Sequence, residues 1–530
     1  MVDFSTTQKS STPDESVQHA ALANDRASQR HIRGSTILFI GRIISLVLNF
    51  GVQVLTVRYL TKSDYGAFAY ALSIASIGAS ISLFGLDKAV SRFIPIYHEK
   101  NDLRKMLGAV VMTFGTIVGI GLALVFIVIG LRGVWSTYVL DDATALSLLV
   151  IMIALAPMQA MDSWFQGMFA VFAKPRAIFF RRHVLGPGLK LLAVIIVIIS
   201  GATVYTLALG YLIGGFLGLL AYMTMLWQLL RENNLLQGSL IRNLDMPFRE
   251  VFSFSSPLLT SDVVTILRSS MVIVLLEYFA NTTEVAEFRA VLPVAGLNLV
   301  VMQSFKYLFT PLAARLFSRE DWHGLNDLYW HTAIWIAVFS FPIFAVSFSL
   351  ARPVTVLLFE SRYASSAIIL AILALGNYFN SALGLNSYTL RVYGKVRFIV
   401  GIDLASGLLS LVLSLLLIPQ YGAVGAAIAV SSTIIIYNLL NHAGLSLGTE
   451  IKLFRWRYLR VYTSIIAGAA LLWLCDALLE LHFGISFALT ALVSIMLLRI
   501  NREVLDVEVM FPELKRLPFL RTLMMTKAEA

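Results

Sequence analysis

The chain has 530 residues, of which 58% are hydrophobic and only 14% are charged, and its mean hydropathy is +0.79. A soluble globular protein carries about 25% charged and 45–50% apolar residues, so a water-soluble enzyme is excluded. The net charge of +10 would indicate nucleic acid as a partner of a soluble protein, but in a membrane protein it records which loops stay in the cytoplasm. The single cysteine, Cys475, excludes a disulfide framework and a cysteine-based zinc site.

Residues 1–34 are rich in Ser, Thr, Gln and Ala and lack the apolar stretch of a signal peptide, so they predict a disordered cytoplasmic tail. After this tail, apolar stretches long enough to span a bilayer recur between short polar breaks. They lie near residues 35–58, 64–85, 106–131, 145–171, 178–200, 203–229, 251–276, 287–312, 328–350, 364–388, 398–418, 422–445, 458–479 and 483–500. The pattern predicts an all-α, polytopic membrane protein with about 14 transmembrane helices.

The positions of Lys and Arg predict how these helices are oriented. If the N-terminal tail is inside, 31 of the 41 Lys and Arg residues fall in the tails and in the breaks on that side, and 6 fall in the opposite breaks. Because cytoplasmic loops carry an excess of Lys and Arg, this ratio predicts a protein of the cytoplasmic membrane with both termini in the cytoplasm. The outer breaks are too short for a folded extracellular domain.

The two halves of the chain resemble each other at a fixed spacing. Residues 172–176 (Phe-Ala-Lys-Pro-Arg) precede residues 393–397 (Tyr-Gly-Lys-Val-Arg) by 221 positions, as Gly201 precedes Gly422. Each unit has six helices, an even number, so both copies start from the same side and form a parallel repeat. The predicted parts are an N-lobe at 35–230, a cytoplasmic linker at 231–250, a C-lobe at 251–447, two further helices within 448–500 and a cytoplasmic tail at 501–530.

Ionisable residues inside the predicted helices are the strongest candidates for a functional site. Arg42, Asp262, Arg268 and Lys306 lie in the first, seventh and eighth helices. At 1.5 Å per residue, Arg42 and Lys306 lie about 13 Å into the bilayer and Asp262 lies near its midplane. Charged groups at such depths face a cavity or a partner, and the planar fork of Arg suits phosphate. We therefore predict that Arg42, Arg268 and Lys306 line a cationic cleft that binds an anionic head group.

Asp262 admits two interpretations. It lies 220 residues after Arg42, at the equivalent position of the repeat, so it is either the ion-pair partner of Arg42 or a site for a coupling ion. Within the first lobe, Asp162 and Lys190 are expected to form a buried pair. Four amide side chains in the first and eighth helices are weaker candidates for the cleft: Asn49, Gln53, Asn298 and Gln303. Their amides could bind sugar hydroxyls or join one helix to another.

Sequence signatures of catalysis are missing. The chain has no P-loop motif and no H-E-x-x-H motif, and its eight histidines have no ligand spacing. The outer breaks hold no paired carboxylates of the kind a membrane glycosyltransferase would need. The sequence therefore predicts neither an enzyme nor a bound cofactor or metal.

Four segments carry a family resemblance. They are residues 58–68 (Arg-Tyr-Leu-Thr-Lys-Ser-Asp-Tyr-Gly-Ala-Phe), 254–259 (Phe-Ser-Ser-Pro-Leu-Leu), 358–363 (Leu-Phe-Glu-Ser-Arg-Tyr) and 418–427 (Ile-Pro-Gln-Tyr-Gly-Ala-Val-Gly-Ala-Ala). In this order, over about residues 35–450, they resemble the polysaccharide transporter and O-antigen flippase family of the multidrug/oligosaccharidyl-lipid/polysaccharide (MOP) exporter superfamily. Arg42 matches the family's habit of an intramembrane Arg in the first helix.

The resemblance implies a fold like that of the MATE transporters and lipid flippases. It also implies a flippase that moves a lipid-linked (polyprenyl pyrophosphate) oligosaccharide by alternating access, for the synthesis of O-antigen or exopolysaccharide. Expected partners are this substrate, membrane lipids, a coupling cation (H⁺ or Na⁺) and polysaccharide assembly machinery, but not nucleic acid.

Other interpretations remain open at this stage. The last two helices are like those of lipid II flippases, so a peptidoglycan precursor is an alternative substrate. A drug/cation antiporter of the same superfamily would have an acidic rather than a basic cleft. A membrane glycosyltransferase or polymerase would need catalytic carboxylates.

Overall fold

The computed structural model describes residues 40–138, 142–172, 174–232, 243–452, 456–479 and 482–505. In these ranges 11 helices are long and apolar enough to cross a membrane, or up to 13 when each of two bent pairs is taken as one span. One of them, α20 (Val396–Gly448), has 53 residues and is interrupted by a non-helical backbone at Gly422, so it supplies two spans. The predicted all-α fold with about 14 transmembrane helices is confirmed. The N-terminal tail, most of the C-terminal tail and the middle of the linker lie outside the described residues.

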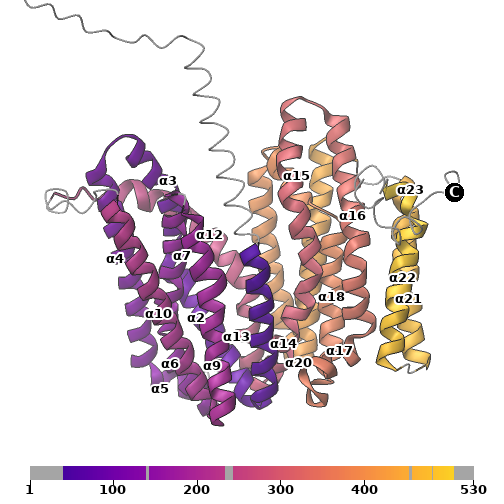
Figure 1. Cartoon of the computed structure of the whole chain (residues 1–530), viewed down its shortest axis with the longest axis horizontal. Coiled ribbons are helices and arrows are strands. Elements are labelled where there is room, and N and C mark those ends of the chain that lie inside the picture. The colour runs from indigo at the N-terminus through magenta and orange to yellow at the C-terminus, as the bar shows by residue number, and fades with distance from the viewer. Residues whose placement is uncertain are drawn as a thin grey trace, which may run out of the picture.

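The first group of helices, here called the N-lobe, lies on the left of Figure 1. It begins with the helix Ile40–Tyr59 and continues with α2 (Lys62–Leu83), α3 (Leu86–Glu99), α4 (Leu103–Gly130), α5 (Arg132–Tyr138), α6 (Ala143–Met152), α7 (Leu155–Val171), α8 (Pro175–Ile178), the π-helix η1 (Phe179–Leu185), α9 (Gly186–Ser200) and α10 (Val204–Glu232).

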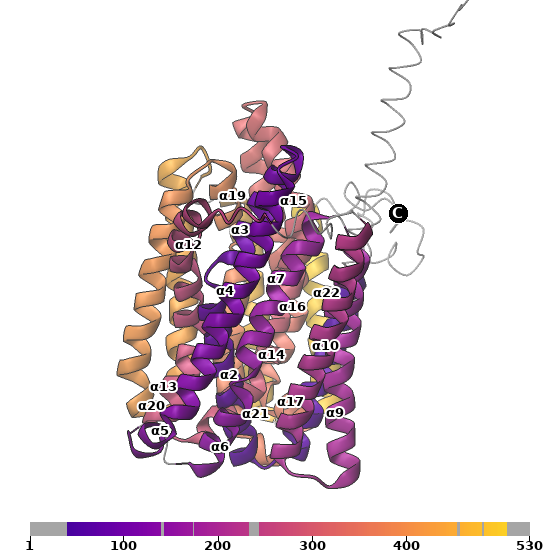
Figure 2. The ribbon, with the colours of Figure 1, turned by 90° about the vertical axis from the view of Figure 1, so that its left-hand side faces the viewer.

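The second group, here called the C-lobe, lies beside it. It comprises α12 (Phe248–Ser269), α13 (Met271–Phe279), α14 (Thr282–Gly296), η2 (Leu297–Leu299), α15 (Val300–Ser318), α16 (Trp322–Ser349), α17 (Ala351–Phe359), η3 (Ser361–Tyr363), α18 (Ser366–Ala382), α19 (Asn386–Val392) and α20. The chain ends with η4 (Trp456–Tyr458), α21 (Leu459–Leu479), α22 (Phe483–Ile500) and α23 (Arg502–Leu505). Helices α21 and α22 pack on α16, at the flank of the C-lobe away from the N-lobe (Figure 1). The side view in Figure 2 shows α20 running along one edge of the molecule.

Three predicted helices differ in detail from the observed ones. The second does not end at a loop, because Phe84 and Gly85 adopt left-handed conformations and α3 starts directly after them. The fourth bends by 40° between α6 and α7. Pro157 lies in the first turn of α7 and has no N–H to donate to a carbonyl of the preceding helix, which favours a break there. The seventh bends by 42° between α12 and α13.

The hydrophobic core is divided into three clusters, and this division sets the shape of the molecule. One cluster joins both lobes and includes Phe68 of α2, Phe288 of α14 and Phe359 of α17. Another includes Trp164 of α7 and consists of N-lobe residues together with Val251 of α12, whereas the third, around Trp330 of α16, combines the C-lobe with α21 and α22. The lobes therefore share one core at one end, here called the closed end, and have separate cores at the other, here called the divided end. The closed end is at the bottom of Figure 1.

The two repeats share an unusual backbone position. Gly201, between α9 and α10, has φ +63°, and Gly422, at the equivalent position 221 residues later, has φ +52°. Positive φ is readily adopted only by glycine, which explains why both copies carry it. At Gly422 a side chain would also meet Glu284, because an added Cβ would lie 2.7 Å from its Oε2.

We predict that Gly422→Ala lowers the thermal stability of the purified protein. The backbone strain alone is worth about 1–3 kcal/mol, and the clash with Glu284 adds to it. A thermal melt in detergent measures the effect. Gly401→Ala is the matched control, because Gly401 lies in the helical part of α20 with no atom near its added Cβ. Equal melting temperatures for Gly422→Ala and the wild type would contradict the prediction.

Candidate functional site

At the closed end, an arginine of the C-lobe caps a helix of the N-lobe. The helix Ile40–Tyr59 ends there, and the last carbonyls of a helix lack partners within it. Arg362 donates to the carbonyls of Val57 at 2.8 Å and Leu60 at 2.9 Å, and also to that of Arg58. A cation at a helix C-terminus is further favoured by the helix dipole.

The reverse contact lies beside it. Arg58 of the N-lobe donates to the carbonyl of Leu358 at 2.9 Å and to that of Leu357, in the last turn of α17. Each lobe thus uses one guanidinium to satisfy carbonyls at a helix end of the other lobe. We call Arg58, Arg362 and these carbonyls the arginine clasp.

Further polar contacts cross between the lobes at this end. Lys62 forms an ion pair with Glu287 at 2.5 Å. Gln53, a predicted cleft residue, donates to the Tyr65 hydroxyl at 2.5 Å and to the Arg289 carbonyl at 3.4 Å. Gln53 therefore takes part in sealing the closed end and does not line an open cleft in this conformation.

At the divided end, Arg42 makes one of the contacts that join the lobes. Its Nη1 donates to the hydroxyl of Tyr307 on α15 at 2.9 Å, and both side chains are exposed. The neighbouring Lys306 lies 4.5 Å above the ring of Tyr388 on α19, and Arg391 lies 5.6 Å from the same ring. Arg42 thus contacts α15 through Tyr307, whereas the ammonium of Lys306, the preceding residue of α15, contacts α19.

Helix α12 belongs to the C-lobe in sequence but also contacts the N-lobe. Asp262 of α12 forms an ion pair with Lys88 of α3 at 2.8 Å. Glu250, near the start of the same helix, accepts a hydrogen bond of 2.6 Å from Tyr97. Asp262 is therefore not the partner of Arg42, and that interpretation is wrong. The reason is that α3 continues α2 as a helix and brings Lys88 to the position where sequence analysis expected a loop.

Arg268 contacts residues of its own lobe. It faces Asp403 of α20 at 3.6 Å and the ring of Tyr437 at 4.5 Å, both within the C-lobe.

The remaining amide candidates occupy different environments. Asn298 is 0% exposed and donates to Ser347 at 3.0 Å and to the Ala295 carbonyl, so it joins helices and does not line a cleft. Gln303 is partly buried on α15. Asn49 donates to the backbone and hydroxyl oxygens of Ser45 and lines a separate cavity.

This cavity lies within the N-lobe and has a volume of about 540 Å³. We call it the N-lobe cavity. It is lined by the first helix, α2, α7, η1, α9 and α10, through the residues Ser45, Asn49, Leu72, Ser76, Leu155, Met158, Gln159, Asp162, Ser163, Gln166, Arg181, Arg182, Gly186, Pro187, Lys190, Tyr211, Gly214 and Gly215.

The predicted pair of Asp162 and Lys190 does not form. Asp162 pairs instead with Arg181 of the π-helix at 2.8 Å, and the Lys190 ammonium lies 5.6 Å from the ring of Tyr211. Sequence analysis placed Arg181 and Arg182 inside the expected helix at 178–200 but counted them with the cytoplasmic cations that record orientation. The observed span, Arg176–Ser200, contains both arginines. Treating them as charges inside a span would have made them candidate site residues.

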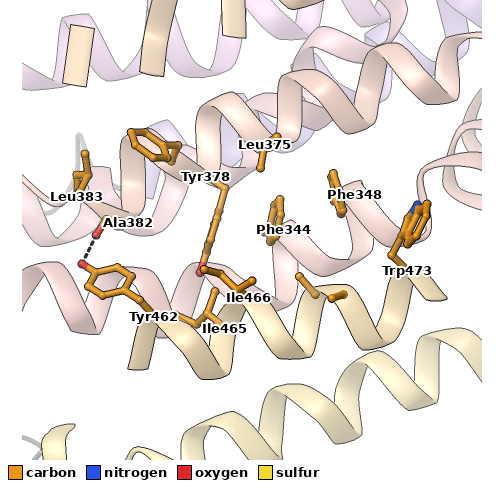
Figure 3. A pocket seen from close by; sticks show the side chains of 13 residues that line it. Phe344, Phe348, Leu375, Tyr378, Ala382, Leu383, Tyr462, Ile465, Ile466 and Trp473 are labelled. Carbon is orange, nitrogen blue, oxygen red and sulfur yellow. Dashed lines mark hydrogen bonds between the residues drawn. The ribbon is translucent and has the colours of Figure 1, made fainter. Parts of the chain in front are cut away.

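A second cavity, of about 530 Å³, is apolar and lies between α16, α18 and α21 (Figure 3). The ring of Tyr378 stacks on Phe344 at 4.1 Å, and the hydroxyl of Tyr462 donates to the Ala382 carbonyl at 2.8 Å. The lining offers hydrocarbon contacts and no charged group, so it is not a candidate for an anionic head group.

Comparison with known proteins identifies the family. Residues 31–317, more than half of the chain, match the family described as polysaccharide biosynthesis protein. The chain belongs to this family. The polysaccharide transporter and flippase family predicted from the sequence is thereby confirmed. A curated relative, an uncharacterized membrane protein of Methanocaldococcus jannaschii, is 21% identical over 424 residues, which is 76% of this chain and 81% of the relative.

Solved structures share the fold of this chain. It is similar to the lipid II flippase MurJ in an inward closed conformation, with a TM-score of 0.66 and 15% identity over 91% of this chain and 99% of the flippase. It is also similar to an inward-facing MATE transporter of the MOP superfamily, with a TM-score of 0.61 and 14% identity over 77% of this chain and 96% of the transporter. The MATE-like and lipid-flippase fold predicted from the sequence is confirmed.

We predict that Arg362→Ala loosens the closed end, because it leaves three carbonyls of the other lobe without their donor. Spin labels at Thr137→Cys and Tyr421→Cys, in a Cys475→Ala background, report the separation of the lobes there. We expect a longer or broader distance distribution than in the parent. The control is Arg132→Ala, an exposed arginine in the N-lobe. An unchanged distribution for Arg362→Ala would show that the clasp does not hold the lobes together.

Proposed function

We propose that this protein is a flippase that carries a lipid-linked oligosaccharide across the cytoplasmic membrane for polysaccharide synthesis. The observation that supports it best is the division of the core, with one shared cluster at the closed end and separate clusters at the divided end. Two lobes joined at one end can rock about that end and expose the region between them to alternate sides. The family and the fold agree with this activity.

The proposed orientation places the divided end in the cytoplasm. Clusters of Lys and Arg lie at this end, for example Arg104 and Lys105 at the start of α4 and Arg315 and Arg319 at the end of α15. An excess of cations is typical of the cytoplasmic side. In this conformation the region between the lobes would face the side on which lipid-linked precursors are made, and the arginine clasp would close the outer side.

We assign the pyrophosphate to the region around Arg42. A guanidinium is always charged and can bind phosphate through two parallel hydrogen bonds. The hydroxyl partner of Arg42, Tyr307, is neutral, so the positive charge is available to an anion. Lys306, on the adjacent residue of α15, supplies a second cation. The polyprenyl chain would stay in the bilayer while the head group crosses between the lobes.

A lipid II-type flippase is the second candidate. It is favoured by the length of the structural match, because the lipid II flippase covers 91% of the chain and the MATE transporter covers 77%. A drug/cation antiporter is disfavoured by the basic character of the Arg42 region. We propose a transporter and not a glycosyltransferase or polymerase, and we propose H⁺ or Na⁺ coupling and contact with polysaccharide assembly machinery as further properties.

One experiment separates the two substrates. The gene is deleted in its host, and the lipid-linked saccharides that accumulate on the cytoplasmic side are extracted and identified. Accumulation of a polyprenyl-linked oligosaccharide supports the proposal. Accumulation of lipid II would support the peptidoglycan alternative, and accumulation of neither would contradict both.

We predict that Arg42→Ala abolishes transport while the protein level in the membrane is unchanged. The side chain is exposed and makes one interhelical contact, so its loss removes a charge without opening a core. Surface polysaccharide in the deletion strain and flipping in proteoliposomes provide two readouts. Arg397→Ala, an exposed arginine of the C-lobe, is the control. Normal surface polysaccharide from Arg42→Ala would refute the cationic region as the substrate site.

We predict that Lys88→Asp and Asp262→Lys each slow transport and that the two together restore it. Each single change places two like charges together across the lobe boundary. A coupling energy of about 1.4 kcal/mol between residues 88 and 262 corresponds to a tenfold change in the transport rate. Flipping is measured in proteoliposomes with and without H⁺ and Na⁺ gradients. Recovery of transport in the double variant assigns Asp262 to an ion pair that holds the lobes together. A double variant that transports but no longer responds to a gradient would instead assign Asp262 to ion coupling.

A further inference from the structure

The N-lobe cavity and Arg42 lie on the same face of the first helix. Ser45 and Asn49 line the cavity, and they lie three and seven residues after Arg42. Residues at this spacing share one face of a helix. A head group bound at Arg42 therefore lies at the start of a polar path that leads into the N-lobe.

One of the cavity's cations is already neutralised. Arg181 is only 11% exposed, forms the 2.8 Å ion pair with Asp162 and lies 5.5 Å from the ring of Tyr222. Gly218 and Gly186 make room for it, because an added Cβ would lie within 2.3 Å and 2.7 Å of its guanidinium. Arg181 and Asp162 together form an electrically neutral part of the wall of the N-lobe cavity.

Two further cations are not neutralised. Arg182 donates to the amide oxygen of Gln166 at 2.6 Å, and Lys190 contacts the ring of Tyr211 at 5.6 Å. Among the described residues, neither has a carboxylate at ion-pair distance. Both side chains are exposed, so their positive charges are accessible to an anionic ligand in the cavity.

The rest of the lining suits hydroxyl groups. Ten of the 18 lining residues are polar or charged without counting Tyr211, whereas small-molecule pockets are lined predominantly by apolar and aromatic side chains. Asn49, Gln159, Ser163 and Gln166 supply amide and hydroxyl groups that can donate and accept hydrogen bonds. Tyr211 adds an aromatic face.

We propose that the N-lobe cavity binds an acidic sugar of the oligosaccharide, a hexose that carries a carboxylate or a phosphate group. The acidic group binds Arg182 and Lys190, and the ring hydroxyls bind the amides. This assignment rests on the proposed function, because it makes the cavity a specificity site for the glycan while the pyrophosphate stays at Arg42. The cavity thus selects which glycan is carried.

Binding to the purified, full-length protein tests this site without transport. Isothermal titration compares cellobiouronic acid with cellobiose, which differ only in the oxidation of one hydroxymethyl group to a carboxylate. We expect the acidic disaccharide to bind about tenfold more tightly, as one charge-assisted hydrogen bond would give. Glucose 6-phosphate and inorganic phosphate are titrated in parallel to distinguish a sugar phosphate from a free anion.

Variants connect the preference to the cavity. Lys190→Met and Arg182→Gln should reduce the preference for the acidic disaccharide to near one, and Lys190→Arg should retain it. Lys174→Met is the matched control, because Lys174 pairs with Glu232 at 2.9 Å on the surface of the same lobe. Thermal melts identify any variant that fails to fold. Lys190→Met and Arg182→Gln each test the preference independently, so one folded variant is sufficient for the test.

Several outcomes would overturn the proposal. One is equal binding of acidic and neutral disaccharides by the wild type. A second is an unchanged preference in both charge-removing variants, and a third is inorganic phosphate binding as tightly as glucose 6-phosphate. Flipping assays separate the site from the proposed function. Acidic-sugar binding without any flipping would leave the site standing and refute the flippase, whereas flipping that is indifferent to acidic sugars would refute the site alone.

Discussion

The arginine clasp is the contact on which the arrangement of the two lobes depends. The last carbonyls of a helix lack partners within it and need another donor. Arg58 and Arg362 provide donors across the lobe boundary, and the shared core lies directly beside them. Because each arginine belongs to the opposite lobe from the carbonyls it caps, separating the lobes at this end would remove the donors from both sets of carbonyls.

The charged residues of the chain fall into groups with different structural roles. Cations at the surface of the divided end would mark the cytoplasmic side in the proposed orientation. Lys88–Asp262 and Lys62–Glu287 hold the lobes together at two levels, and Arg268–Asp403 and Arg181–Asp162 stabilise one lobe each. Arg42, Lys306, Arg182 and Lys190 remain without a carboxylate partner among the described residues, and our proposals concern these four.

The fold could be predicted from the sequence to a greater extent than the site. Helix number follows from apolar length, and the repeat follows from matched glycines such as Gly201 and Gly422, because both signals are local in the sequence. The partner of Asp262 was not predictable, because it depends on α3 continuing as a helix past Gly85 and bringing Lys88 across. Arg181 and Arg182 were missed because a helix that begins in a π-helical turn carries its first cations inside the apolar span, where counting by loops overlooks them.

The ion pair between Arg181 and Asp162 has a consequence for the transport cycle. It joins α7 to the π-helix η1, and Gly218 of α10 packs closely against the same guanidinium. In the proposed cycle these elements would move as one rigid body, and the N-lobe cavity would keep its shape while the lobes rock. A sugar held there would meet the same groups on either side of the membrane. Release would then depend on the ion gradient, on dilution or on downstream consumption of the glycan, and not on any loosening of the cavity.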